Sequence, residues 1–457
     1  MSTVAPTVTE GVGGKKTSGS WLSVWTPEDD VFWRQKGSKV AWRTLILTTA
    51  TLVLSFATWF VMSALVVLLP GVGFKFDTMQ LFWLAAMPGL AGGTLRIIHT
   101  FLIPIYGTRS VLSVATLIKL IPCIGLAFAV MNPNTPFWVF MVLAFLAGMG
   151  GGDFSSFMPS TSLFFPKRLQ GTALGIQAGV GNFGVSLTQF VTPWIIGVGL
   201  VGAPQLLTKG NVTKSVWLQS GVLWYVPLLA ALGALCWIYL RSVPVKASFR
   251  EQLDIFKDKH TWFCTITYVM TFGSFSGFSA AFPLMIKIIY GKFPNAPDPL
   301  AFAFLGPLIG SSVRVLFGFV ADKTGGGILT QISGLGMLLV CGAMVMTGVL
   351  TPTSLDSFPL FVTLMLSLFF FSGMGNASTF RQFPVIFSHS PRQGAQVLGW
   401  TGAVAAYGPF AFSSLVGTSI TMTGSAVAFI VAAGAFYLVA TGINWFYYCR
   451  KGCERPS

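Results

Sequence analysis

Two arginines stand in the middle of apolar segments that are long enough to be buried in a lipid bilayer. They are Arg96, in LAAMPGLAGGTLRIIHTFLIPIYG, and Arg314, in FAFLGPLIGSSVRVLFGFV. A guanidinium at the bilayer centre costs about 2.5–3.5 kcal/mol on insertion scales, so such a residue usually faces a protein interior and a partner. The two positions are separated by close to half of the 457-residue chain. That spacing predicts one arginine in each half of a duplicated structure, with both cations facing one cavity as an anion site.

A second group of titratable side chains lies in the same kind of segment. Asp153 is the only one of the thirteen Asp and Glu residues that stands deep within an apolar run, and Lys119 stands in the middle of another. Two roles are open for Asp153: a structural ion pair with Lys119, or a proton-binding site. His99 follows Arg96 by three residues and therefore lies near it on a helix surface. It is a further titratable candidate, although a packed neutral histidine is the favoured interpretation.

The composition assigns the chain to a class. Hydrophobic residues make up 53% and charged residues only 9%, whereas soluble domains carry about 25% charged residues. This predicts a polytopic membrane protein surrounded by lipid. The net charge of +15 comes from basic residues that border apolar segments and form no continuous patch, so nucleic acid is not an expected partner. The sequence has no catalytic dyad, metal-ligand cluster or nucleotide-binding motif, so we expect no enzymatic activity, no cofactor and no metal.

Apolar runs of spanning length occur twelve times. The polar residues 241–260 split them into six and six. We therefore expect an all-α membrane protein with twelve transmembrane helices in two pseudo-symmetric bundles, arranged as a tail 1–40, a bundle 41–240, a linker 241–261, a bundle 262–448 and a tail 449–457. With the termini inside, nineteen Lys and Arg lie on the inner side and four on the outer side. This bias predicts a multi-pass protein of the cell (inner) membrane, with both termini and the linker cytoplasmic.

An internal repeat supports the division into halves. FLAGMGGGDFSSF (145–157) resembles FFSGMGNASTFRQF (370–383), and LGIQAGVGNFGVS (174–186) resembles LGWTGAVAAYGPF (398–410). Offsets near 225 and parallel six-helix halves of this kind characterise the major facilitator fold. Glycines in and around these stretches let helix backbones approach closely, and we expect contacts there that change as the halves rock. These glycines are Gly171, Gly179, Gly181, Gly399, Gly402 and Gly408.

Several stretches resemble a single family over nearly the whole chain. AGGTLR (91–96), FFPKRLQGTALGIQAGVGNFG (164–184), TYVMTFGSFSGFSAAF (267–282) and LGWTGAVAAYG (398–408) resemble the nitrate/nitrite porter family of the major facilitator superfamily. The resemblance implies that fold, transport by alternating access, and nitrate and nitrite as substrates. Two further stretches, YGTR (106–109) and ADKTGG (321–326), resemble the loop-gating motif of the superfamily, and the second contains Asp322.

The resemblance also implies roles for single residues. Arg96 and Arg314 are expected to hold the planar anion, and the rings of Phe154 and Phe272 to sandwich it. Tyr268 and Asn182 are expected to hydrogen-bond to it. From its residue type alone, Asn182 is equally consistent with an interhelical hydrogen bond and with a substrate contact.

The family contains proton–nitrate symporters and nitrate/nitrite exchangers. The short loop SHSPRQG and the preceding STFRQFPVIF, with Arg381, resemble the symporter type. We therefore expect nitrate import coupled to protons, with Asp153, Lys119 and His99 as the residues concerned, in a monomer. Exchange for nitrite is the alternative. A passive anion channel is a more remote one, because it requires a continuous pore rather than mobile, duplicated halves.

Overall fold

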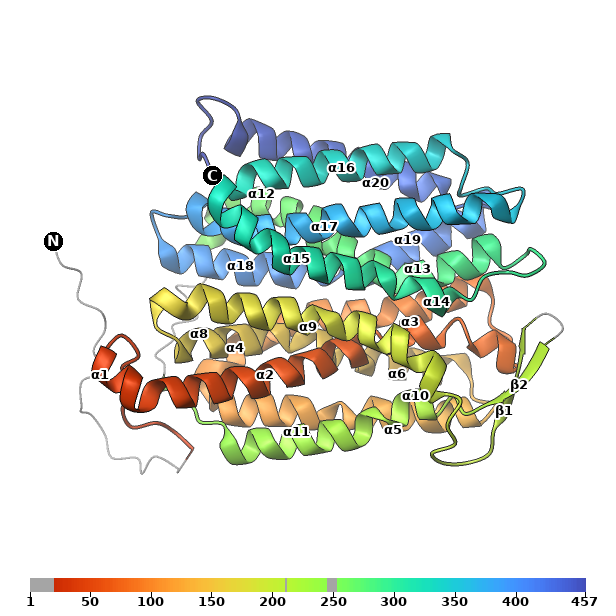
Figure 1. Ribbon diagram of the computed structural model, residues 1–457, viewed down its shortest axis with the longest axis horizontal. Coiled ribbons are helices and arrows are strands. Elements are labelled where there is room, and N and C mark those ends of the chain that lie inside the picture. Colours follow the sequence, from red (N-terminus) through yellow and green to blue (C-terminus); the bar gives the residue numbers. More distant parts are fainter. Residues whose placement is uncertain (1–19, 210–211, 245–252) are drawn as a thin grey trace.

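The computed structural model describes residues 20–209, 212–244 and 253–457. Residues 1–19 of the expected N-terminal tail and residues 245–252 of the expected linker lie outside this part of the chain. The helices of the amino-terminal half lie together on one side of the molecule, and those of the carboxyl-terminal half lie on the other (Figure 1). Most of the long helices run along the same axis. The predicted α-helical fold of two bundles is confirmed.

The elements of the amino-terminal half end with residue 239. In chain order they are α1 (Asp30–Phe32), the π-helix η1 (Trp33–Gly37), α2 (Ser38–Trp59), α3 (Val61–Leu65), the 3-10 helix η2 (Leu69–Val72), α4 (Thr78–Ile118), α5 (Leu120–Met131), α6 (Phe137–Ala147), α7 (Met149–Gly152), α8 (Phe154–Phe164), α9 (Lys167–Ile195), β1 (Gln205–Lys209), β2 (Val212–Val216), α10 (Ser220–Leu223) and α11 (Tyr225–Tyr239).

The elements of the carboxyl-terminal half begin with residue 254. In chain order they are the 3-10 helix η4 (Asp254–Lys257), α12 (Lys259–Tyr268), the π-helix η5 (Val269–Gly273), α13 (Ser274–Tyr290), α14 (Pro299–Ala303), α15 (Leu305–Thr324), α16 (Gly326–Met346), the 3-10 helix η6 (Leu355–Ser357), α17 (Phe358–Ile386), α18 (Pro391–Ala405), α19 (Gly408–Thr423), α20 (Val427–Asn444) and the π-helix η7 (Trp445–Cys449).

Eleven helical stretches in the described residues are long and apolar enough to cross a membrane. They correspond to eleven of the twelve predicted spans, and the chain is an integral membrane protein. The remaining span is α9, which is 29 residues long but carries the buried amides of Gln177, Asn182 and Gln189. These polar residues make α9 less apolar than its neighbours. Because α9 packs against α2 and α15, the amides have protein around them rather than lipid.

The first spanning helix begins earlier than the expected boundary between tail and bundle. Asp29 caps it, since its carboxylate accepts hydrogen bonds from the backbone N–H of Val31 at 2.9 Å and of Phe32 at 3.4 Å. The helix then continues from Asp30 through η1 into α2 without a break. Arg168 adds an ion pair with Asp30 at 2.6 Å. The segment from 30 to 40 is therefore part of the first helix.

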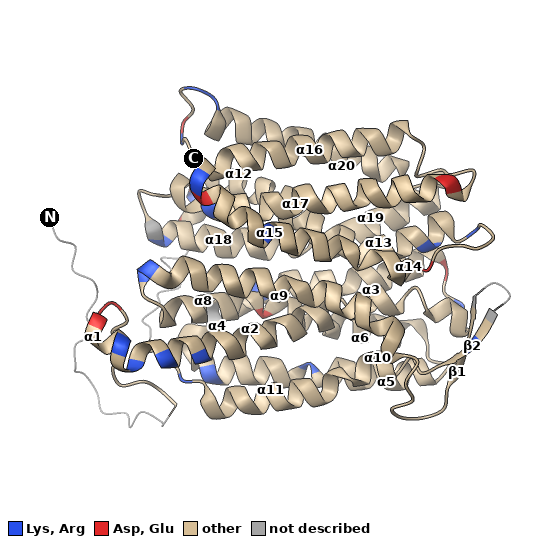
Figure 2. Ribbon diagram, in the orientation of Figure 1, with Lys and Arg blue, Asp and Glu red and all other residues tan. Residues whose placement is uncertain are grey.

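The two ends of the bundles carry different features. The C-terminus and α1 lie at one end, here called the termini end (Figure 1). The opposite end, here called the hairpin end, carries an antiparallel hairpin in which Gln205 of β1 pairs with Val216 of β2. This hairpin is a small addition to the predicted all-α fold. Many of the Lys and Arg residues gather at the termini end (Figure 2), which agrees with the charge bias of the sequence.

Both halves make the same unusual turn at the same place. Gly107 interrupts α4 with φ 76° and ψ 161°, and Gly325 separates α15 from α16 with φ 88° and ψ 148°. Side chains of L-residues rarely allow this backbone conformation, so glycine is required at both positions. The two glycines have the same separation in the sequence as Arg96 and Arg314. The repeat seen in the sequence is therefore present in the backbone.

Candidate functional site

Arg96 stands on α4 and its side chain is wholly buried. Its Nε donates a hydrogen bond to the carbonyl oxygen of Gly151 at 2.8 Å, and its Nη1 donates one to the carbonyl oxygen of Gly402 at 2.6 Å. Gly151 belongs to the same half, whereas Gly402 belongs to α18 of the other half. The Arg96 side chain therefore bridges the two halves. Because both acceptors are neutral carbonyls, the positive charge is not cancelled and is available to an anion.

Arg314 stands on α15 of the carboxyl-terminal half, and 6% of it is exposed. Its Cζ lies 4.8 Å from the centroid of the Phe380 ring. The hydroxyl of Tyr268 lies within reach of the guanidinium. A ring face attracts a guanidinium through its negative quadrupole, and this holds Arg314 in place without using its N–H donors.

The Phe272 ring lies close to both arginines. Its centroid is 5.2 Å from Cζ of Arg96 and 6.0 Å from Cζ of Arg314. Both distances end at the same ring centroid, so the two Cζ atoms can be no farther apart than the sum of these distances. The structure thus brings together two arginines that the sequence places in different halves of the chain.

A π-helical turn positions the aromatic side chains of the carboxyl-terminal half. Tyr268 ends α12, and Phe272 lies in η5, one turn later. Their rings stack with centroids 5.5 Å apart and planes inclined by 8°. Single π turns inside α-helices occur frequently at functional sites, since they redirect side chains by one position. Here the turn directs two neighbouring rings toward the arginine pair.

Rings from the amino-terminal half complete the surroundings of Arg96. Its Cζ lies 4.7 Å from the Phe154 ring centroid and 5.3 Å from that of Trp59. Trp59 and Phe380 were not predicted as site residues. Their types carry no signal in a chain with 42 phenylalanines and 14 tryptophans. The carbonyls of Gly151 and Gly402 were not predicted either, because backbone acceptors leave no trace in residue type.

Several buried polar atoms at this level have no hydrogen-bond partner among the described residues. They include Nη2 of Arg96, Nη1 of Arg314, and both polar atoms of the Asn182 side chain. Most buried polar groups in proteins are hydrogen-bonded, and leaving one unpaired costs about 1–3 kcal/mol. Asn182 stands on α9 near Gly179, which contacts Val315, the neighbour of Arg314. The unpaired N–H donors of two cationic side chains lack a hydrogen-bond acceptor. A bound anion would supply that acceptor.

The predicted titratable residues form a separate cluster behind Arg96. Asp153 Oδ2 is ion-paired with Lys119 Nζ and accepts a hydrogen bond from Ser55 Oγ at 2.6 Å. His99 Nδ1 lies 3.0 Å from Ser156 Oγ and 3.9 Å from Asp153 Oδ1. Both partners of the ion pair are almost fully buried. Two roles were open for Asp153, an ion pair with Lys119 and a proton-binding site. The structure contains the ion pair.

This cluster is connected to the anion-type site through two helices. Asp153 lies between Gly151, whose carbonyl binds Arg96, and Phe154, whose ring faces Arg96. His99 lies on α4 about one turn after Arg96. Asp153 is therefore close in the chain to two groups that contact Arg96.

Two of the predicted glycines lie at contacts between the halves. A Cβ added at Gly179 would lie 2.7 Å from Cγ2 of Val315 on α15. A Cβ added at Gly402 would lie 3.8 Å from Nη1 of Arg96 on α4. Gly179 therefore allows a close approach of α9 to α15, and Gly402 faces the arginine directly.

The other predicted glycines have different surroundings. Gly181 packs against Leu52 and Gly408 against Gly273, each within its own half. An added Cβ at Gly171 or Gly399 would meet no atom within 4 Å. The expectation of a helix contact is therefore not met at Gly171 and Gly399 in this structure, and the Gly181 contact is internal to one bundle.

Contacts between the halves lie from the level of Arg96 to the hairpin end. Side-chain hydrogen bonds there join Thr94 to Tyr407 at 2.9 Å, Ser186 to the Phe304 carbonyl at 2.9 Å, and Gln189 to the Ser279 carbonyl at 2.8 Å. Toward the termini end, an added Cβ at Gly175, Gly318 or Gly399 would meet open space. In the described part of the chain, the side-chain hydrogen bonds between the halves thus lie toward the hairpin end, and these three glycines toward the termini end have open space beside them.

The loop-gating stretches lie at the termini end. Asp322 pairs with Nε of Arg381 at 3.1 Å and joins α15 to α17, with both side chains largely exposed. In the amino-terminal half, Cζ of Arg109 lies 4.4 Å from the ring centroid of Trp237. Each stretch therefore ties together helices of its own half at that end.

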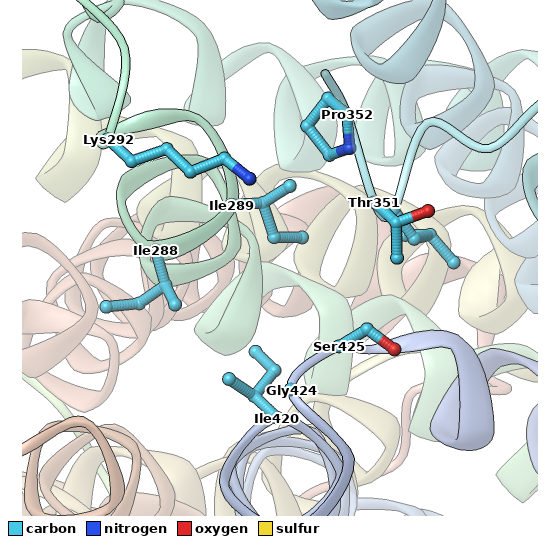
Figure 3. A pocket seen from close by; sticks show the side chains of 9 residues that line it. Ile288, Ile289, Lys292, Thr351, Pro352, Ile420, Gly424 and Ser425 are labelled. Atoms are coloured by element: carbon cyan, nitrogen blue, oxygen red, sulfur yellow. The ribbon is translucent and has the colours of Figure 1, made fainter.

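A cavity of about 230 Å³ lies elsewhere, at the hairpin end of the carboxyl-terminal half. It is formed by the ends of α13 and α19 and by the segment after α16. Figure 3 shows its lining residues, among which Lys292 is the one charged side chain. None of the residues predicted for the site lines it, so it is a different place from the arginine pair.

Comparisons with known proteins agree with this arrangement. Residues 47–413 match the model of the Major Facilitator Superfamily. The chain is 58% identical to the "Probable nitrate/nitrite antiporter NarK2" of Thermus thermophilus, over 97% of this chain and 99% of that protein. It is 36% identical to the "Nitrate/nitrite transporter NarU" of Escherichia coli K12, over 96% of this chain and 98% of that protein. A bacterial homologue of the lysosomal transporter Spinster, solved as a crystal structure, shares the fold with a TM-score of 0.65 at 14% identity, over 88% of this chain and 97% of that one.

Proposed function

Because the chain belongs to the nitrate/nitrite porter family of the Major Facilitator Superfamily, we propose that it carries nitrate and nitrite across a membrane by alternating access. The observation that carries this proposal is the arginine pair. Arg96 and Arg314 come from different halves, are both buried, and both keep unpaired N–H donors beside the shared Phe272 ring. An anion bound there would contact both halves at once.

The chemistry of the pair suits a small planar oxyanion. A guanidinium presents its N–H donors in a planar fork that matches two oxygens of one ligand. The rings of Phe154 and Phe272 lie close to Arg96 and offer flat faces to a flat ion. Asn182 and Tyr268 supply further donors. We propose these six residues as the substrate site, with the two arginines carrying most of the affinity.

We propose that the protein is a monomer in the inner membrane. The proposed orientation places both termini in the cytoplasm. It rests on the nineteen Lys and Arg residues of the segments expected inside, against four outside. In this orientation the structure is open toward the cytoplasm, because the contacts between the halves lie toward the hairpin end. Alternating access would close the termini end, where Gly171 and Gly399 have open space.

For the coupling we propose exchange of nitrate for nitrite. Moving one charge across 100 mV costs about 2.3 kcal/mol, and exchange of two monovalent anions avoids that cost without a titrating residue. Asp153, the carboxylate that proton symport would use, is already engaged in the buried ion pair with Lys119. This reverses the order of the two mechanisms expected from the sequence.

Proton symport is the second candidate, and the His99 contacts favour it. His99 is a titratable group near both Asp153 and Ser156, on the same helix as Arg96. A proton taken up there would change the charge around Asp153, next to the Phe154 ring. The two candidates differ in what drives uptake, so they are separable in vesicles.

The test uses purified protein in sealed liposomes. Under exchange, nitrate enters only when nitrite or nitrate is loaded inside, and collapsing a pH gradient leaves the rate unchanged. Under symport, an imposed pH gradient drives uptake into vesicles that contain neither anion. A channel would show no stimulation by anion on the opposite side. Absence of nitrate and nitrite transport under every condition would refute the proposed function.

A further inference from the structure

The buried amide of Asn376, in the carboxyl-terminal half, makes no hydrogen bond within the described residues and is not one of the six proposed site residues. Asn376 stands on α17 and its side chain is wholly buried. Neither Nδ2 nor Oδ1 has a hydrogen-bond partner among the described residues. By contrast, the neighbouring buried amide of Gln382 accepts from Thr330 at 2.9 Å and donates to Asn444 at 2.8 Å. The unpaired state is therefore particular to Asn376 and not a property of amides on this helix.

Asn376 lies on the face of α17 that is turned toward the site. Residues 369, 376, 380 and 383 share one face, because their spacings of seven, four and three follow the helical period. Phe369 contacts Phe275 with ring centroids 6.1 Å apart, and Phe380 and Phe383 contact Tyr268 at 5.5 and 6.1 Å. Asn376 stands between these rings in the sequence. It is the polar position in an aromatic stripe that faces Tyr268 and its neighbours.

The level of Asn376 along the helix matches that of Arg314. Gly373 packs directly on Gly310 of α15. Arg314 is four residues after Gly310, and Asn376 is three residues after Gly373. The two helices are alternate spans of one bundle and run in the same direction, so advances that differ by only one residue, about 1.5 Å, bring the two side chains to similar depths. Phe380, one turn after Asn376, already contacts Arg314.

The internal repeat shows how the two halves differ at this position. In the alignment of 145–157 with 370–383, Asn376 corresponds to Gly151. Gly151 offers Arg96 its carbonyl oxygen. The carboxyl-terminal half therefore has an amide side chain at the place where the amino-terminal half has only backbone. At this position the carboxyl-terminal half has one more side-chain donor and acceptor than the amino-terminal half.

Building on the proposed function, we propose that Asn376 is a specificity-determining residue that favours nitrate over nitrite. Its Nδ2 donates a hydrogen bond to the third oxygen of nitrate, while Arg96 and Arg314 hold the other two. Nitrite has only two oxygens, so it leaves the amide unpaired when both arginines are engaged. A site built to hydrogen-bond a group discriminates against a ligand that lacks it, because the buried partner is then left unsatisfied.

The test compares affinities for nitrate and nitrite in purified protein by calorimetry, with Asn376→Leu as the variant. Leucine keeps the volume and removes the hydrogen bond. We expect nitrate to bind about tenfold more weakly and nitrite to change by less than about threefold. Asn376→Ala, which also lacks the amide, provides the same comparison if the leucine variant does not fold. The control is Gln382→Leu, which removes a paired amide and should lower thermal stability while leaving the nitrate-to-nitrite ratio unchanged.

The outcomes separate this inference from the proposed function. An unchanged ratio in a folded Asn376 variant would overturn the inference while leaving the arginine site intact. A control variant that shifts the ratio as much as Asn376→Leu would also overturn it, since the effect would then come from general packing. If the unmodified protein binds neither anion, the proposed function fails instead.

Discussion

The two halves of the molecule fill corresponding places with different polar groups. In the amino-terminal half, Asp153 is ion-paired with Lys119. The repeat aligns Asp153 with Ser378, which instead shares a hydrogen bond of 2.8 Å with Thr330 in a neutral network that continues to Gln382. Replacing a buried ion pair by neutral groups is often neutral or stabilising. Because one half has neutral groups at the corresponding position, a bundle of this kind can fold without the ion pair.

The largest effect is expected from breaking this ion pair. Lys119→Met leaves the Asp153 carboxylate buried without its cation, and this should cost about 3–5 kcal/mol of unfolding free energy. The matched change in the other half, Ser378→Ala, removes one neutral hydroxyl, which hydrogen-bonds to Thr330 and to the Gly375 carbonyl, and should cost about 1–2 kcal/mol. Thermal unfolding in detergent measures both. Equal losses would contradict the comparison of the halves.

A double variant sharpens the same comparison. Lys119→Met combined with Asp153→Ser transfers the neutral chemistry of the carboxyl-terminal half to the amino-terminal half. We expect it to regain most of the stability that Lys119→Met loses, because no unpaired charge remains. If it transports nitrate with the same driving force as the unmodified protein, the ion pair is structural. A change in that driving force assigns the pair to coupling.

A smaller effect is expected from replacing the arginines one at a time. Arg96→Lys and Arg314→Lys keep the charge but lose the planar fork, so nitrate uptake should fall by roughly 10- to 100-fold. The loss should be greater for Arg96, because its guanidinium also holds the carbonyls of Gly151 and Gly402. Initial rates in liposomes measure this. Arg168→Lys, at the exposed end of α9, should leave uptake unchanged.

Leucine substitutions at Gly179 and Gly399 should shift the equilibrium between the two transport conformations in opposite directions. Gly179→Leu collides with Val315 and should disfavour the present state by about 1–3 kcal/mol. Gly399→Leu enters open space and should disfavour closure of the termini end instead. Labelling of a cysteine introduced at Gly175 reports the opening, and should fall with the first change and rise with the second. A shift in the same direction for both would refute the proposed motion.

The smallest effect concerns pH and the C-terminal tail. Hydrogen bonds from Lys259 and His260 lower the pKa of Glu454 to about 2. A lowered pKa stabilises the folded tail above the ordinary value for glutamate, about 4.3, and that contribution is lost as pH falls toward the folded value. The pKa of Asp258 is also lowered, since hydrogen bonds from His260 N–H and Arg455 outweigh its burial. The hydrogen-exchange protection factors of residues 452–457, corrected for the intrinsic exchange rate at each pH, should therefore fall between pH 4 and 2, and Glu454→Gln should weaken that dependence.

Residue type predicted the site only where that type is rare in its surroundings. Arg96, Arg314, Lys119 and Asp153 were identifiable because charged side chains are exceptional within apolar spans. Trp59 and Phe380 are ordinary residue types in this chain and became visible only through their distances to the guanidinium groups.

Other features depend on the conformation rather than on the residue. Gly171, Gly181 and Gly399 share the small size of Gly179, yet one packs within its bundle and two face open space. A glycine allows close approach but does not specify which helix approaches or in which state. The expected start of the bundle at residue 41 lies after the beginning of the first spanning helix at Asp30, because an Asp29 cap within a polar stretch gives little apolar signal.

The turns at Gly107 and Gly325 indicate how deep the arginine site lies in the membrane. Arg96 precedes Gly107 by eleven residues, and Arg314 precedes Gly325 by eleven. At 1.5 Å per residue, each arginine lies about 16 Å from its turn, close to half of a hydrocarbon core about 30 Å thick. An anion held by both arginines would thus lie about half-way through the hydrocarbon core. Because alternating access connects that depth first to one side and then to the other, the affinity measured from one side should change with membrane potential by at most about 2.3 kcal/mol per 100 mV.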